Sequence, residues 1–351
     1  MKYLIWVALF ILVAAGVAGW SSYSGLRSPL ELGLDRTAEV SPSPTSPSPV
    51  RETNEVEFPP VDTTKLWQHL EAVAGERYGD SDRAQVRNYL SRQLQAVGFS
   101  PSLQPFAGGV NLVAQRQGTD PQAGTILVGA HYDTVLRSPG VDDNATGVAA
   151  VLEVARLLGP RPTPRTLQIV FFDREETGLA GSFAFTSNGA KLRNLQAAVV
   201  LDMIGYACRT QGCQRYPEGL PVKPLLEGAG VTSPNQGEFI AVVGDAEHLP
   251  LLGTFPQSHQ MGLPPVVAVP VPLKGILTPD VLRSDHAPFW YKGIGAVLVT
   301  DTANLRSPHY HQPSDTLATL DRPFFTGAVQ VVVNATAKLL ESHEALENRN
   351  G

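Results

Sequence analysis

Apolar residues along this chain of 351 residues follow two patterns. Short apolar runs bounded by turn residues predict buried strands, whereas apolar residues three or four positions apart predict helices that bury one face. On this basis strands are expected at residues 103–106, 110–114, 126–130, 167–172, 197–201, 240–243, 266–269 and 296–299. Helices are expected at about 66–73, 81–97, 147–158, 180–192, from 246, at 285–291 and from 322 into the 340s.

Strands that alternate with helices in this way predict an α/β fold with a largely parallel sheet covered on both faces. In such sheets, functional sites gather where the strands reach their carboxyl ends. Ser81 and Asp82 are placed to cap the second helix. Residues 205–265 are the least regular stretch, and its first part is predicted to be a surface loop. This loop either forms a rim of the functional pocket or is a plain surface excursion.

The first twenty residues predict export. After Lys2, residues 3–20 form an unbroken apolar run that is long enough to span a bilayer. Small residues near its end are also compatible with a signal peptide, but the length and the weakly charged flanks favour an uncleaved anchor. Lys2 predicts that the N-terminus lies inside and the rest of the chain outside. The expected organisation is an anchor or signal peptide at 1–20, a Ser/Pro-rich linker at 21–60, a catalytic domain at 61–343 and a tail at 344–351.

The charge composition argues against nucleic acid as a partner of the chain. It carries 27 Lys and Arg against 33 Asp and Glu, a net charge of −6, with no basic stripe of the kind that binds nucleic acid. Cys208 and Cys213 lie close together in sequence. In an exported protein they could close a small disulfide loop, and two free thiols are an equally compatible interpretation.

The connection after the strand at 126–130 holds more ligand chemistry than a loop needs, namely His131, Asp133, Asp142 and Asp143. Asp133 lies two positions after His131, where it can accept the second ring N–H of a metal-bound imidazole. An acid that only caps the helix at 147–158 would account for one of the adjacent acids, but not for both beside a histidine.

Further candidates follow later strands. Glu175 and Glu176 end one strand, and their side chains should point in different directions, so that one can bind metal while its neighbour acts on a water. Asp202 directly follows another strand, where an ionised carboxylate needs a partner. Each signal alone also fits a solvated surface pair or a strand-end cap. Near the C-terminus, His309 and His311 are candidate ligands. Histidine combined with carboxylates suits zinc, and one carboxylate can bridge two ions.

The ordered set of motifs from residue 61 to the early 340s resembles the M28 family of zinc aminopeptidases. These motifs are H-Y-D, P-G-V-D-D-N-A-T-G, F-D-R-E-E-T-G-L-A-G-S, L-D-M, S-D-H and H-Y-H-Q-P-S-D-T. The resemblance implies a three-layer α/β/α sandwich with a mixed, mostly parallel central sheet. It also implies two Zn²⁺ per chain that activate a water for attack on peptide or small aminoacyl substrates.

In that resemblance, Asp142 is the carboxylate that bridges the two metals, and its peptide bond to Asp143 is cis. His131 and Asp202 complete one zinc site, and Glu176 and His311 complete the other. The implied general base is Glu175, and Tyr310 matches a tyrosine that binds the substrate carbonyl oxygen in some members. The residues expected to support the metal ligands are Asp133, Asp143, Asp285 and His286.

Two other functions share this fold. One is a glutaminyl-peptide cyclotransferase, which works with a single zinc. The other is a non-catalytic ectodomain, which should have lost metal ligands. The complete ligand set and the paired acids at 142–143 favour the aminopeptidase.

Overall fold

The computed structural model describes residues 58–217 and 220–347. The predicted anchor or signal peptide and nearly all of the predicted linker lie outside the described residues. Within the described part of the chain, no helix combines the length and the apolar character needed to cross a membrane.

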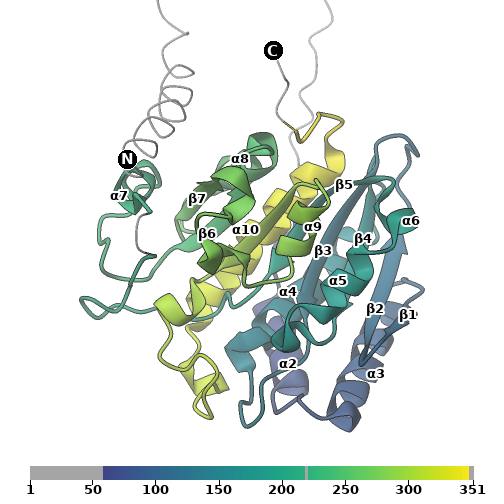
Figure 1. Ribbon diagram of the computed structural model, residues 1–351, viewed down its shortest axis with the longest axis horizontal. Coiled ribbons are helices and arrows are strands. Elements are labelled where there is room, and N and C mark those ends of the chain that lie inside the picture. The colour runs from purple at the N-terminus through teal and green to yellow at the C-terminus, as the bar shows by residue number, and fades with distance from the viewer. Residues whose placement is uncertain (1–57, 218–219, 348–351) are drawn as a thin grey trace, which may run out of the picture. The chain divides into compact units, whose positions relative to one another are not determined.

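An eight-stranded mixed sheet organises the described residues, in the strand order β1-β2-β4-β3-β5-β8-β6-β7 (Figure 1). The four central strands β4, β3, β5 and β8 run parallel to one another. On one side, β2 pairs antiparallel with β4 and β1 pairs antiparallel with β2. On the other side, β6 pairs antiparallel with β8. The strands are β1 Ser102–Phe106, β2 Gly109–Arg116, β3 Thr125–His131, β4 Thr166–Phe172, β5 Leu195–Leu201, β6 Ile240–Asp245, β7 Val266–Val271 and β8 Ala296–Thr300.

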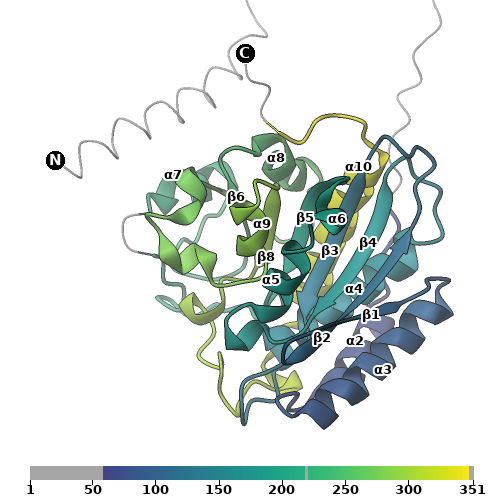
Figure 2. The same ribbon diagram turned by 45° about the vertical axis from the view of Figure 1, so that its right-hand side comes forward.

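Helices cover both faces of this sheet, and each face has its own apolar core (Figure 2). β4 is buried along its whole length, which explains its near-continuous apolar sequence. One face packs against α2 Thr63–Val73, α3 Asp80–Ala96, α4 Gly147–Leu158, α8 Leu249–Gln257 and α10 Arg322–Glu341. The other packs against α5 Ala180–Thr186, α6 Gly189–Leu192, α7 Val222–Gly228 and α9 Ala287–Tyr291. The predicted three-layer sandwich with a mixed sheet is confirmed.

The differences from the predicted elements are local. The second helix begins at Asp80, with Gly79 in the capping position and no side-chain cap. The prediction that Ser81 and Asp82 cap it is therefore wrong, because both residues already lie in its first turn. The helix expected at 180–192 divides in two, since the Asn188 side chain accepts a hydrogen bond from the N–H of Ala190 and begins a new turn. The short helix α7 was not predicted within the irregular stretch.

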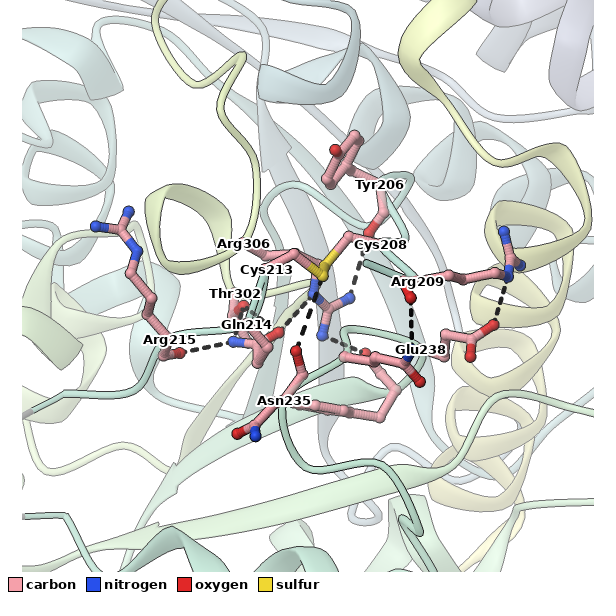
Figure 3. Close-up of a disulfide and its surroundings, with 12 residues drawn as sticks. Tyr206, Cys208, Arg209, Cys213, Gln214, Arg215, Asn235, Glu238, Thr302 and Arg306 are labelled. Atoms are coloured by element: carbon pink, nitrogen blue, oxygen red, sulfur yellow. Dashed lines mark hydrogen bonds and ion pairs between the residues drawn. A yellow bond between two sulfur atoms is a disulfide. The ribbon is translucent and has the colours of Figure 1, made fainter. Parts of the chain in front are cut away.

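The irregular stretch begins with a loop that is held by a disulfide and a β-bridge (Figure 3). Cys208 and Cys213 form a disulfide, so the disulfide alternative is the correct one. Cys208 also forms a β-bridge with Gly237. Behind the loop, the buried Arg306 guanidinium donates hydrogen bonds to the side chain of Gln214 and to the carbonyls of Tyr206 and Phe239.

Replacing both cysteines with serine is expected to lower the free energy of unfolding by about 2 kcal/mol. The disulfide closes a short loop, with a sequence separation of 5, and so removes only a modest amount of entropy from the unfolded chain. Urea denaturation of the double variant and the parent protein measures the difference. Equal midpoints and slopes for the two proteins would show that the disulfide contributes nothing to stability.

Candidate metal centre

Six polar side chains meet at the carboxyl edge of the central strands, and Asp143 is one of them. His131 is the last residue of β3, Asp202 directly follows β5, and Glu175 and Glu176 begin a turn shortly after β4. β4, β3 and β5 are parallel neighbours, so their carboxyl ends lie at one edge of the sheet. His311 reaches the same place from the connection before α10.

Asp143 lies between the two histidines. Its Oδ1 is 3.3 Å from Nε2 of His131, and its Oδ2 is 3.2 Å from Nε2 of His311. The His131 nitrogen also lies 3.5 Å from Oδ1 of Asp202, and the His311 nitrogen lies 3.0 Å from Oε2 of Glu176. Three groups have their possible ligand atoms within 4.8 Å of one another, namely His131–Asp143–Asp202, His131–Glu175–Glu176 and Asp143–Glu176–His311. The first and the last are the two ligand sets that share Asp143. Asp143 therefore offers one oxygen to each set.

The electrostatics of the cluster favour cations. Nε2 of His131, Nε2 of His311 and Oε1 of Glu176 are buried and have no hydrogen-bond partner among the described residues. Burial and neighbouring carboxylates raise the pKa of Glu175 well above its usual range and that of Glu176 to about 7. Buried polar atoms without hydrogen bonds and crowded carboxylates are both relieved by divalent ions, so the residues present fit a metal centre.

Asp133 supports the cluster from behind. Its Oδ1 lies 3.6 Å from Nδ1 of His131, on the opposite side of the ring from the other ligands. Its two carboxylate oxygens also accept hydrogen bonds from the N–H groups of Glu175 and Glu176, at 3.0 and 3.3 Å. The backbone carbonyl of Asp133 lies 3.3 Å from the same Nδ1, so Asp133 orients the imidazole after β3 while its carboxylate fixes the turn after β4.

The expectation that Asp142 faces the metals is wrong, and so is the expected cis bond between Asp142 and Asp143. The cis peptide bond joins Asp143 to Asn144. The buried Asp142 side chain belongs to none of the groups that could hold a metal, and its Oδ1 accepts a hydrogen bond from the N–H of Gly205 at 2.9 Å. Burial, followed by the charge of Asp301, raises the pKa of Asp142 well above its usual range, and Asp142 belongs to neither ligand set.

Three residues that hold the Asp143 loop were not predicted. Asp315 accepts hydrogen bonds from the N–H groups of Asp142 and Asp143, at 2.8 and 3.1 Å. The side chain of Asn144 donates to the carbonyl of Leu201 at the end of β5. Buried Arg77 donates to carbonyls on both sides of the loop, including that of Gly140. Asp315 lies in the same motif as His311, so the sequence could have indicated its role. No motif in the sequence indicates a role for Arg77.

Tyr310 and His309, two other predicted residues, differ in their relation to the cluster. The Tyr310 ring stacks on that of His311, with ring centroids 3.8 Å apart, and its Oη accepts a hydrogen bond from Arg283 at 2.9 Å. His309 is not brought to the cluster. Its Nδ1 lies 2.9 Å from Oγ of Ser314. Of the two candidate histidines in this segment, the structure selects His311.

Asp285 and His286 are fully buried behind the centre. Burial raises the pKa of Asp285 to about 7, and its carboxyl group lies within electrostatic reach of His131 and Asp202. Burial lowers the pKa of His286 to about 4, and its Nε2 lies 2.8 Å from the carbonyl oxygen of Val281. His286 is therefore a neutral ring that fixes the preceding turn, while Asp285 adds a further carboxyl group behind the cluster.

The cluster opens into a pocket with two kinds of lining. Asp143, Glu175, Glu176 and Asp202 line one part. Apolar side chains from α7 and from strands β6 and β7 line another, including Leu225, Leu226, Val243 and Val269. The segment just after Cys213 also contributes to the pocket, so the predicted loop does form part of its rim.

An α/β/α sandwich that carries a cluster of histidines and carboxylates at the carboxyl edge of its sheet fits a metal-dependent hydrolase. The model of peptidase family M28 matches residues 111–229. The chain is 32% identical to the uncharacterized protein YfbL of Escherichia coli over 251 residues, which cover 68% of this chain and 73% of that protein. It is 31% identical over 216 residues to leupeptin-inactivating enzyme 1 of Streptomyces exfoliatus, covering 59% of this chain but only 40% of that enzyme.

Solved structures show the same fold. An aminopeptidase from Aneurinibacillus sp. strain AM-1 superposes with a TM-score of 0.60 at 15% identity, covering 83% of this chain and 97% of that one. Glutaminyl cyclase from Bacteroides thetaiotaomicron superposes with a TM-score of 0.56 at 16% identity, covering 80% and 98%. The chain belongs to peptidase family M28. It is a metallopeptidase by family, and the His/Asp/Glu cluster described above could hold its metal.

Proposed function

We propose that this protein is a two-zinc aminopeptidase that releases N-terminal residues from peptides. The observation that carries the proposal is the position of Asp143, which presents one oxygen to His131 and the other to His311. A carboxylate that served a single ion would not need to face two separate ligand sets. Shared carboxylates of this kind hold two metals in hydrolytic enzymes.

Each zinc would have three protein ligands. His131, Asp143 and Asp202 would hold one ion, and Asp143, Glu176 and His311 would hold the other. Three protein ligands leave room for water or substrate, as catalytic zinc sites require. When bound, the two ions supply Lewis acidity, which makes a water nucleophilic near neutral pH and polarises the scissile carbonyl group.

The remaining steps belong to residues of the chain. Glu175 is buried beside the cluster and has a raised pKa, so it is suited to take a proton from the attacking water and return it to the leaving amine. Tyr310 is held by its stacking on His311, and its hydroxyl can donate to the oxygen on which negative charge develops. Asp133 keeps the His131 imidazole in a fixed orientation throughout.

The two parts of the pocket explain action at an N-terminus. The free amino group of a peptide is positively charged and would be attracted to the carboxylates at one end. The apolar wall, with Leu225, Leu226 and Val269, would accept the side chain of the first residue. This arrangement favours peptides that begin with an apolar residue.

We also propose that the protein acts outside the cytoplasm. The apolar run at residues 3–20 is suited to direct export, as an anchor or a signal peptide. The Cys208–Cys213 disulfide supports the same location, since such bonds persist in oxidising compartments.

A panel of aminoacyl p-nitroanilides and dipeptides tests this function. The zinc-loaded protein should hydrolyse substrates with a free N-terminus, a chelator should abolish the activity, and added zinc should restore it. The same substrates with an acetylated amino group serve as the control and should resist cleavage. Equal cleavage of the acetylated substrates would contradict an aminopeptidase. Cyclisation of N-terminal glutamine with one bound zinc would indicate the cyclotransferase instead.

A further inference from the structure

We infer that Arg283, assisted by Arg215, forms a subsite for the free α-carboxylate of a short peptide, which makes dipeptides the preferred substrates. The inference rests on the proposed function and specifies its substrate class. Both arginines line the pocket into which the metal centre opens. They come from separate segments, Arg283 just after the turn Pro279–Leu282 and Arg215 two residues after the disulfide.

The two guanidinium groups converge on one residue. Arg283 Nη1 lies 3.4 Å from Oδ1 of Asn304, and Arg215 Nη2 donates to the carbonyl oxygen of the same asparagine. Figure 3 shows the Arg215 side chain directed away from the disulfide and from the Gln214–Arg306 hydrogen bonds. The two guanidinium groups thus bond to two different oxygens of one residue, and two like charges held this close favour an anion between or beside them.

Neither arginine has a carboxylate partner within 4.0 Å in the part of the chain that the structure describes. Asp280 lines the same pocket but lies beyond that distance from both. Arg209, in the same disulfide loop, contrasts with them, because it pairs with both Glu238 and Asp321. Arg209 therefore has counter-charges, whereas Arg215 and Arg283 have none within 4.0 Å among the described residues.

The distance between Arg283 and the expected position of the scissile carbonyl group determines the length of the preferred substrate. Arg283 Nη2 lies 2.9 Å from Oη of Tyr310, the hydroxyl that would donate to the scissile carbonyl oxygen. A further hydrogen bond of about 2.8 Å places that oxygen within roughly 6 Å of the guanidinium. Consecutive residues are about 3.8 Å apart, so the carboxylate within reach is that of the residue directly after the scissile bond. A dipeptide meets this condition, with its amino group at the acidic end of the pocket and its carboxylate at the arginines.

The test compares Leu-Ala with Leu-Ala-amide on the zinc-loaded full-length protein. We expect kcat/KM to be about tenfold or more higher for the free acid, the usual effect of a hydrogen bond to a charged group. In Arg283→Met this ratio should fall towards 1. Any general effect on Tyr310 cancels in the ratio, since both substrates use that residue. The control variant Arg193→Met removes an exposed arginine that does not line this pocket and should keep the parent ratio.

A third substrate, Leu-Asp-amide, separates an α-carboxylate from an acidic side chain. Cleavage as fast as that of Leu-Ala would overturn the α-carboxylate assignment, and an unchanged acid-to-amide ratio in Arg283→Met would overturn the role of this arginine. If the parent protein cleaves acid and amide equally, the subsite fails while the proposed function stands. If it cleaves neither, the proposed function fails, and calorimetric binding of Leu-Ala and Leu-Ala-amide to the parent and Arg283→Met proteins still decides the subsite.

Discussion

Glu175→Gln is expected to retain two equivalents of zinc and to lose about 10²–10⁴-fold in kcat, the usual contribution of a positioned general base. Glutamine has nearly the shape of glutamate, so the turn after β4 and its hydrogen bonds to Asp133 should persist. It has no basic oxygen that could take a proton from the attacking water. Steady-state hydrolysis of a leucyl substrate, together with metal analysis of the same sample, measures both quantities.

A matched control for this variant is Glu227→Gln. Glu227 is an exposed residue of α7 within 3.9 Å of Lys223, and it does not line the pocket. Its replacement should leave both hydrolysis and zinc content at the level of the parent protein. Activity of Glu175→Gln within tenfold of the parent, with full zinc content, would show that another group takes the proton.

Asp143→Asn is expected to lose both metals together, because this side chain contributes an oxygen to each ligand set. The change removes one carboxylate oxygen and the negative charge, so zinc affinity should fall by more than about 100-fold, beyond the 10–100-fold effect of losing an outer partner. Metal analysis after dialysis against a weak chelator measures the number of zinc ions retained.

The adjacent residue provides the matched variant. Asp142→Asn keeps an oxygen that can accept the hydrogen bond from the N–H of Gly205, and the raised pKa of Asp142 makes a neutral side chain acceptable at this buried position. This variant should retain two equivalents of zinc. Loss of both metals from Asp142→Asn, with retention in Asp143→Asn, would reverse the assignment of the bridging residue.

Much of the fold could be predicted because its strands are buried on both faces and its helices carry apolar residues at a regular spacing. α4, for example, was expected at 147–158 and is Gly147–Leu158. Helix ends and the short α7 were less predictable, because they depend on local hydrogen bonds and on packing against β7. The spacing of apolar residues along the sequence carries no information about these interactions.

The sequence by itself determined which residue types surround the metal centre and after which strands they come. Only the tertiary structure decided between Asp142 and Asp143. Two adjacent acids give the same signal in a sequence, and which of them faces the histidines depends on hydrogen bonds between this loop and the distant residues Asp315, Leu201 and Gly205. Arg77 and the proximity of Arg215 to Arg283 could not be predicted for the same reason. Arg77 binds backbone carbonyls, and Arg215 and Arg283 both bind Asn304, and only folding brings these partners within reach.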